Sequence, residues 1–234
     1  LTSGRLDGRT QVFIRLSYDL AADSPGWPGN PKLEFHRHTS MDRGDIVNHT
    51  LFTLFTHFGS HLDTPLHWQQ NGESVTDLPI ERFIYLSPVV IDVPKGPRAF
   101  ITAAEIEAHS AAMVGKDCLL IRTGFSRYRQ SEPETYSAQG PALAPEAAQY
   151  VVDNFPQLKA IGMDCISIAS PAMIDEAIAT HRILCGYHDP TKSLIILEDF
   201  NLDFDLSRLK RVYALPLFLK GAEGSPCTIV AEIE

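Results

Sequence analysis

The sequence predicts an α/β protein in which layers of a mixed β-sheet pack against flanking helices. Apolar, strand-like runs alternate with helix-like segments in the middle of the chain, and both ends are rich in strand-like segments. Of the 234 residues, 44% are hydrophobic and 21% are charged, which excludes a disordered chain. No break in composition and no internal repeat marks a boundary, so we expect a single domain over residues 1–234.

The first 93 residues contain three expected strands. Residues 12–18 alternate between apolar and polar side chains and lead into a turn cluster rich in proline and glycine at residues 23–31. Residues 46–58, rich in Thr, Phe and Leu, are expected to form a strand that runs into a histidine-dense segment. Residues 86–93 predict a buried strand that ends before a proline.

Helix signals are found at two places. Thr102 and Glu105 form a capping-box pattern, so we expect a helix from there to about Ala112. Pro145 suits the first turn of a second helix, which is expected to run to about Asn154.

Apolar runs in the second half predict further strands. Residues 118–123 are apolar at consecutive positions, as in a parallel strand that is covered on both faces. Residues 159–164 and 193–197 are expected to be strands as well, whereas residues 124–140 are expected to form a long polar loop.

Charge and hydropathy exclude several classes of partner. The formal net charge is −9, and the short basic clusters at residues 127–129 and 208–211 are typical of a solvated face, so we expect no nucleic-acid partner. No apolar stretch reaches the length of a membrane span, so we expect no membrane association. A small-molecule substrate is the expected partner.

The cysteines and the N-terminal residues bear on the compartment. Cys118 and Cys165 lie in apolar runs and are expected to be buried thiols, and no pair of cysteines has CxxC spacing. The first residues show no apolar segment of a signal peptide, although the chain does not begin with Met. A reducing, cytoplasmic location is the expectation.

One short segment combines three histidines with a carboxylate: His57, His61, Asp63 and His67. All four positions are odd-numbered, so an extended segment would place these side chains on one face. Imidazole and carboxylate groups are typical ligands of zinc and manganese. We therefore predict a site for a divalent metal, Zn or Mn, with His57, His61 and Asp63 as ligands.

Two further residues are candidates for the same site. His67 is either a fourth ligand or an acid–base group, and the turn at Pro65 suits a proton shuttle better than a ligand. Glu198 ends the apolar run of residues 194–197, where an ionised carboxylate is costly unless it is paired or bound to a metal. Glu198 is therefore either a ligand or the point at which this strand reaches the surface.

Aromatic residues near these motifs are candidates for the walls of a substrate pocket. Trp27 lies in a turn rich in Pro and Gly, where a core residue is less expected, so we predict that it contacts the substrate. Trp68 follows the histidine segment directly and is a second candidate. Phe35, Phe55 and Phe58 are further candidates for the pocket, although core packing is the stronger expectation for these three residues.

The spacing His57-x-Gly59-Ser60-His61-x-Asp63-x-Pro65-x-His67 resembles the signature of the cyclase-like metal-dependent hydrolases, a family that includes bacterial kynurenine formamidase and isatin hydrolase. Ser60 stands where the family usually has threonine, and Asn30 where it often has aspartate. Weaker similarities follow in the family's order at residues 27–29, 120–124, 161–168, 181–184, 195–199, 215–217 and 221–226.

The resemblance implies a swivelling β/β/α-type fold and a homo-oligomer, a dimer or tetramer, with the active site near an interface. It implies one or two metal ions, with His67 as the catalytic acid–base and Trp27 as an aromatic wall of the pocket. The ligands that it implies are His57, His61, Asp63, His181 and Glu198. Residues 185–192 make the interval between the last two longer than in the formamidases, and His188 within this segment is an alternative to His181.

The resemblance, together with Trp27 as an aromatic wall, implies hydrolysis of a C–N amide bond in a small aryl formamide or cyclic amide by metal-activated water. One alternative is a lactone or ester hydrolase on the same fold. Another is a non-catalytic protein that binds a metal or ligand, but such a protein would not need His67.

Overall fold

The structure, a computed structural model, describes residues 3–6 and 9–234 of the chain. The strands are β1 (Ser3–Leu6), β2 (Arg9–Arg15), β3 (Glu34–Thr39), β4 (His49–Thr53), β5 (His61–Asp63), β6 (Ile84–Tyr85), β7 (Pro88–Asp92), β8 (Phe100–Ile101), β9 (Cys118–Arg122), β10 (Ala142–Leu143), β11 (Ala160–Met163), β12 (Ile195–Glu198), β13 (Leu209–Pro216) and β14 (Gly224–Ile233). The α-helices are α1 (Ala103–Glu107), α2 (Ser110–Met113), α3 (Tyr128–Ser131), α4 (Pro133–Ala138), α5 (Pro145–Asn154) and α6 (Ile174–Leu184).

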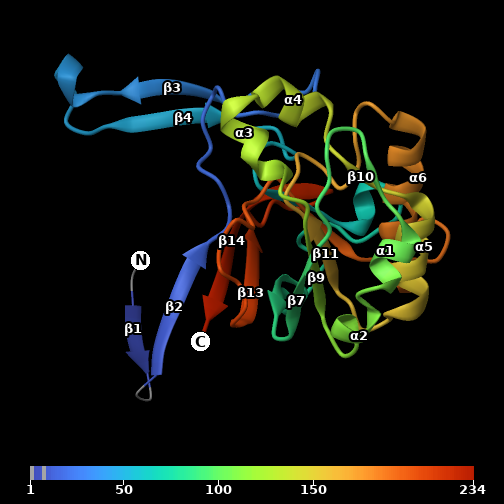
Figure 1. Cartoon of the computed structure of the whole chain (residues 1–234). Helices are drawn as coiled ribbons and strands as arrows, with labels where there is room; N and C mark the ends of the chain where they lie inside the picture. Colours follow the sequence, from blue (N-terminus) through green and yellow to red (C-terminus); the bar gives the residue numbers. More distant parts are fainter. Residues whose placement is uncertain (1–2, 7–8) are drawn as a thin grey trace.

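Ten of the described strands form one mixed sheet (Figure 1). Its order is β1-β2-β14-β5-β12-β11-β9-β7, and β13 pairs with both β14 and β6. Strands β7, β9, β11 and β12 are parallel, and the connections between them carry the helices. Helix α5 packs against both α1 and α6, so these three helices form a layer beside the parallel half of the sheet (Figure 1).

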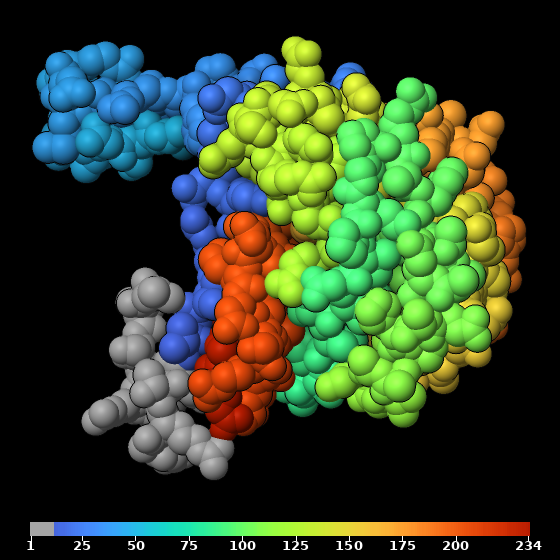
Figure 2. Space-filling view, in the orientation of Figure 1, coloured from blue at the N-terminus to red at the C-terminus, as the bar shows by residue number. Residues whose placement is uncertain are grey.

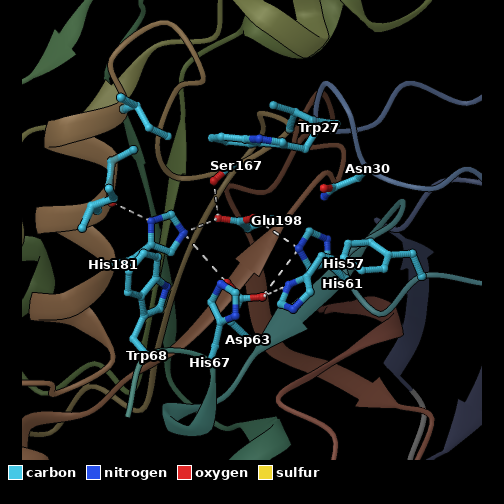
Figure 3. A pocket seen from close by; sticks show the side chains of 15 residues that line it. Trp27, Asn30, His57, His61, Asp63, His67, Trp68, Ser167, His181 and Glu198 are labelled. Atoms are coloured by element: carbon cyan, nitrogen blue, oxygen red, sulfur yellow. Dashed lines mark hydrogen bonds and ion pairs between the residues drawn. The ribbon is translucent and has the colours of Figure 1, made fainter. Parts of the chain in front are cut away.

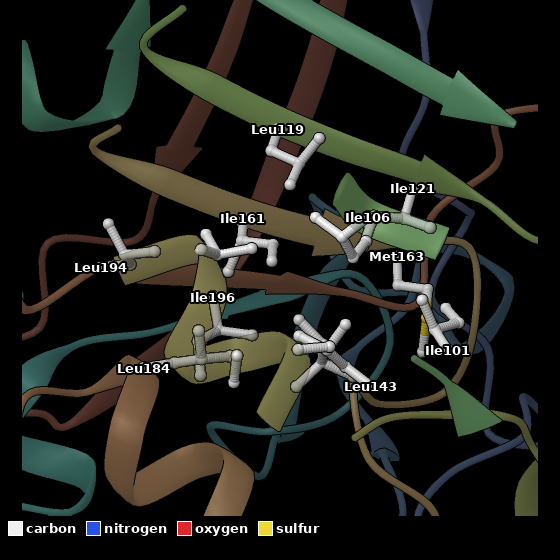
Figure 4. Close-up of a cluster of buried hydrophobic side chains, with 14 of the residues drawn as sticks. Ile101, Ile106, Leu119, Ile121, Leu143, Ile161, Met163, Leu184, Leu194 and Ile196 are labelled. Carbon is white, nitrogen blue, oxygen red and sulfur yellow. The ribbon is translucent and has the colours of Figure 1, made fainter. Parts of the chain in front are cut away.

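The parallel half of the sheet has a hydrophobic core on each face. In β9, Leu119 and Ile121 belong to the core shared with the helices (Figure 4), whereas Cys118 and Leu120 belong to a second core together with residues of β13 and β14. Successive side chains of a strand point to opposite faces. This explains the consecutive apolar residues of β9, and the predicted burial of Cys118 is confirmed, as is that of Cys165.

The short strand β5 joins the parallel and antiparallel halves of the sheet. It is antiparallel to β12 on one side and to β14 on the other. The register with β12 places Glu198 opposite His61, and Asp63 follows two residues later on the same face of β5. The candidate site therefore lies where the two halves of the sheet meet.

Strands β3 and β4 form a hairpin, here called the arm, that projects from the body of the molecule (Figures 1 and 2). Large apolar side chains are exposed along it: Phe35 is 54% exposed, Leu51 61% and Phe52 51%, and Ile46 near the tip is 92% exposed. An isolated two-stranded hairpin is only marginally stable in water.

Most of the predicted elements are confirmed. Residues 86–93, 118–123, 159–164 and 193–197 match β7, β9, β11 and β12, and α5 spans the residues expected for the second helix. The capping box of Thr102 and Glu105 is also present. None of the helices in the described chain combines the length and apolar composition needed to cross a bilayer.

Other predictions were wrong in part. Residues 124–140 contain α3 and α4 instead of the expected loop. The sequence does not indicate these helices, because they are too short to show a clear periodic pattern. The helix expected over residues 102–112 is broken into α1 and α2, and α6 was not predicted. The strand expected over residues 46–58 ends at Thr53, where the chain leaves the arm. The strand expected over residues 12–18 corresponds to β2, which covers residues 9–15.

Candidate active site

The histidine-dense segment is not one extended strand, so the prediction of four side chains on one strand face was wrong. Gly59 adopts a left-handed conformation with φ of 69°, β5 covers only three residues, and Pro65–His67 form a 3-10 turn. The bend at Gly59 turns the chain between His57 and His61, and their side chains nevertheless converge (Figure 3).

Two groups of possible ligands share Asp63. In the first, His57, His61 and Asp63 each present a ligand atom within 4.8 Å of the others. In the second, Asp63, His181 and Glu198 do the same. Figure 3 shows the five side chains facing one another at the bottom of a pocket.

Short contacts connect the two groups. His57 Nδ1 lies 2.8 Å from Asp63 Oδ1, and His61 Nε2 lies 3.2 Å from Glu198 Oε2. His181 Nε2 lies 3.4 Å from Glu198 Oε1 and 3.9 Å from Asp63 Oδ2. The two carboxylates thus lie between the three imidazoles.

The long segment after α6 does not separate His181 from Glu198. His181 lies in the last turn of α6, and the chain returns through residues 185–194 to β12, which ends at Glu198. His188 within this segment is exposed and contacts the ring of Tyr187. Within the described residues it belongs to neither group of possible ligands.

The cluster has the electrostatics expected of a cation site. Asp63 is only 1% exposed and Glu198 only 4%, and the ion-pair partners of both carboxylates in residues 3–6 and 9–234 are histidines, not Lys or Arg. Burial opposes the charged form of His61, but the Glu198 and Asp63 carboxylates raise the pKa of its imidazole to about 9. Burial likewise opposes ionisation of Glu198, but His181 and His61 hold the pKa of this carboxyl well below its usual range.

A proton on the His61 imidazole therefore offsets part of the charge of the two buried carboxylates when no metal is bound. A divalent ion would replace this proton, because metal binding requires neutral imidazoles. A donor set of three imidazoles and two carboxylates also suits zinc or manganese. The residues present thus fit a divalent metal.

Each of the three imidazoles has a partner at its outer nitrogen. His61 Nδ1 lies 2.8 Å from the Gly59 carbonyl oxygen, and His181 Nδ1 lies 2.8 Å from the Ala177 carbonyl oxygen. His57 Nε2 lies 3.1 Å from Glu223 Oε1. Such partners orient the imidazoles of metal sites.

Sequence reasoning missed two residues that hold this cluster. Glu223, just before β14, contacts His57 and accepts a hydrogen bond from Thr56. Ser167 donates a hydrogen bond of 2.7 Å to Glu198 Oε1. Both residues lie in segments that resemble the family, 161–168 and 221–226, but the resemblance assigned neither of them a role in the site.

His67 lies beside the ligand groups but belongs to neither of them within the described chain. Its ring centroid is 4.3 Å from that of His57 and 6.1 Å from that of His181. Burial lowers the pKa of the His67 imidazole, and so do the neighbouring His57 and His181. Asp63 and Glu198 act in the opposite direction but do not reverse the shift. His67 is therefore predominantly neutral at neutral pH.

Above the cluster lies a cavity of about 270 Å³. Apart from His67 and the histidines and carboxylates of the cluster, the lining is mainly apolar. Trp27, Phe55 and Trp68 are aromatic walls, Ile166, Ile174, Ala177 and Ile178 are aliphatic walls, and Asn30 and Ser167 are polar groups. Trp27 and Asn30 face the cluster from the opposite side of the pocket in Figure 3. Of the phenylalanines expected in the core, only Phe58 is there, because Phe55 lines the pocket and Phe35 is exposed on the arm.

Comparisons with known proteins identify the family. The sequence model of the Cyclase family matches residues 14–170, more than half of the chain. The kynurenine formamidase of Geobacillus thermodenitrificans is 31% identical over 215 residues, which cover 92% of this chain and 94% of that protein. The chain belongs to the cyclase-like metal-dependent hydrolases. It is therefore an enzyme, and the His, Asp and Glu groups indicate a divalent metal as its cofactor.

Solved structures show the same fold. Isatin hydrolase A from Labrenzia aggregata, bound to benzyl benzoate, superposes with a TM-score of 0.79 at 22% identity over 95% of this chain and 94% of that chain. An isatin hydrolase bound to the product analogue thioisatinate superposes with a TM-score of 0.80 at 20% identity over 95% and 92% of the two chains. The predicted mixed-sheet α/β fold is thus confirmed.

Proposed function

We propose that this enzyme hydrolyses the C–N amide bond of a small aryl formamide or a cyclic amide. The observation that carries the proposal is the pair of ligand groups sharing Asp63 at the bottom of an aromatic pocket, with His67 beside them. The relatives named kynurenine formamidase favour this substrate class.

The proposed ligands are His57, His61 and Asp63 for one ion, and Asp63, His181 and Glu198 for a second. A bound divalent ion lowers the pKa of a coordinated water to about 7 and polarises a carbonyl oxygen. The outer partners of the imidazoles hold these side chains in place.

His67 is proposed to move protons. Its neutral imidazole can accept a proton at a ring nitrogen from the attacking water and donate it to the leaving nitrogen of the amide. The position of His67, next to His57 but outside both ligand groups, supports this role over that of a fourth ligand.

The experiment that tests the proposed function is turnover of a substrate panel by protein loaded with Zn²⁺ or Mn²⁺. The panel contains aryl formamides, including N-formylkynurenine, together with isatin, lactones and aliphatic esters. Turnover of an aryl formamide or isatin that is lost with a chelator would support the proposal. Turnover of lactones or esters alone would refute the amide assignment.

We expect the Trp27→Ala substitution to raise KM for aryl amides by about tenfold or more, because ring stacking and apolar burial are lost. KM for small aliphatic substrates should change little. Trp27→Phe keeps an aromatic face, so its KM for aryl amides should stay close to that of the unaltered enzyme. Steady-state kinetics of the three proteins measure this effect. An unchanged KM for aryl amides in Trp27→Ala would contradict the substrate contact.

We also propose that the enzyme is a homo-oligomer in which the arm packs against a second copy. The exposed apolar side chains of the arm support this, because burial of such a surface is favourable. Light scattering should give at least twice the monomer mass. Ile46→Asp combined with Leu51→Asp should shift the protein towards monomers, and a monomeric unaltered protein would contradict the proposal.

A further inference from the structure

A buried ion pair lies directly behind the proposed ligand Glu198. Asp199 is fully buried, and its carboxylate accepts two hydrogen bonds from Arg129, Nε to Oδ1 at 2.8 Å and Nη2 to Oδ2 at 2.9 Å. The hydroxyl of Tyr136 donates a third, 2.8 Å long. The Arg129 guanidinium carbon lies 3.8 Å from the centroid of the Tyr18 ring. These residues bring α3, α4 and the chain after β2 to the end of β12.

The backbone at this point is strained. Asp199 has φ of 50°, a left-handed conformation that a residue with a Cβ rarely adopts. Strain of this kind persists only where the surroundings impose it, and burial of an ion pair carries a desolvation cost of its own. Both features fall on the residue that is bonded to Glu198.

The backbone of Asp199 is also linked to the strand that carries His61. The Ser60 hydroxyl donates a hydrogen bond to the Asp199 carbonyl oxygen and accepts one of 2.9 Å from the Tyr18 amide. Ser60 directly precedes His61, and His61 Nε2 lies 3.2 Å from Glu198 Oε2. Asp199 therefore connects β12, which carries Glu198, with the neighbouring strand β5, which carries His61.

We infer that Arg129, Asp199, Tyr136 and Ser60 are positioning residues that set the relative placement of Glu198 and His61 for metal binding. This inference rests on the proposed function. Arg129 and Asp199 thereby have a role beyond the stability of the fold. Their ion pair holds the strained backbone of Asp199, and this backbone joins the two strands that carry Glu198 and His61.

The chain offers a matched control far along the sheet. At the pairing of β13 and β14, Arg211 Nη1 lies 2.8 Å from Glu232 Oε1, and the Tyr213 hydroxyl donates a hydrogen bond of 2.8 Å to Glu232 Oε2. The same three chemical groups thus meet at a place that contacts none of the proposed ligands. Glu232→Gln and Tyr213→Phe repeat the chemical changes of Asp199→Asn and Tyr136→Phe.

The test measures binding of Co²⁺ alone, by competition with a chelator and by the visible absorption of the bound ion, together with thermal unfolding of the metal-free proteins. In Asp199→Asn we expect the dissociation constant for Co²⁺ to rise about 10- to 100-fold and the absorption to change. Tyr136→Phe and Ser60→Ala should raise the dissociation constant less. Ser60→Thr, which keeps the hydroxyl, should bind Co²⁺ with the affinity of the unaltered protein. The two control variants should bind Co²⁺ as the unaltered protein does.

Unaltered affinity and absorption in a folded Asp199→Asn variant would overturn the inference. If that variant does not fold, Tyr136→Phe and Ser60→Ala decide, and unchanged Co²⁺ binding in both would overturn it equally. An equally large loss of Co²⁺ affinity in the control variants would show that the effect comes from a general loss of stability. That result would also refute the positioning role. Failure of the unaltered protein to bind Co²⁺ would instead overturn the proposed function, and the inference with it.

Discussion

The Asp63→Asn substitution is expected to remove metal from both ligand groups and to lower kcat/KM by about 1000-fold or more, because a metal ion contributes several kcal/mol to stabilisation of the transition state. Asp63 is the one residue that both groups contain. An amide in its place is neutral and a weaker ligand than a carboxylate. Elemental analysis after reloading with Zn²⁺ or Mn²⁺, followed by kinetics, measures both effects.

Single-group variants make this prediction sharper. His57→Ala and Glu198→Gln each alter only one group, so each should lower the metal content less than Asp63→Asn does. Asp92→Asn, which removes one charge from an exposed ion pair with Arg122, should leave metal content and activity unchanged. Full metal content in Asp63→Asn would show that the ion binds elsewhere.

The His67→Ala substitution is expected to lower kcat by about 100-fold or more while leaving the metal content nearly intact. The variant loses a positioned proton donor but keeps all of the proposed metal ligands. The effect should appear in both kcat and kcat/KM, as for a group that acts in the transition state. Kinetics together with elemental analysis of the same preparation separate the two roles that the sequence left open for His67.

His188→Ala is the matched control, because it removes an exposed histidine that lies outside both ligand groups of the described chain. It should behave like the unaltered enzyme. Parallel losses of metal and activity in His67→Ala would make His67 a ligand, and full activity would exclude both roles.

The sequence predicted the parallel half of the fold better than the rest. Strands such as β9 are apolar at consecutive positions because both of their faces are buried, and this pattern is readable without tertiary information. The sequence does not predict helix α6, although this helix carries His181, and it predicts a loop where the structure has the short helices α3 and α4. Short helices depend on packing more than on local propensity, as the buried contacts of Arg129 and Tyr136 with Asp199 illustrate.

Residue types and spacing alone determined the chemistry to expect here. Three histidines and an aspartate in one short segment predict a cation site, whereas the acid at the end of an apolar strand is a candidate ligand whose role the sequence leaves open. Only the tertiary structure decided how they meet. Gly59 bends the segment, the register of β5 with β12 brings Glu198 to His61, and α6 brings His181 to both carboxylates. Such contacts between residues far apart in sequence depend on sheet order and packing, which no local pattern encodes.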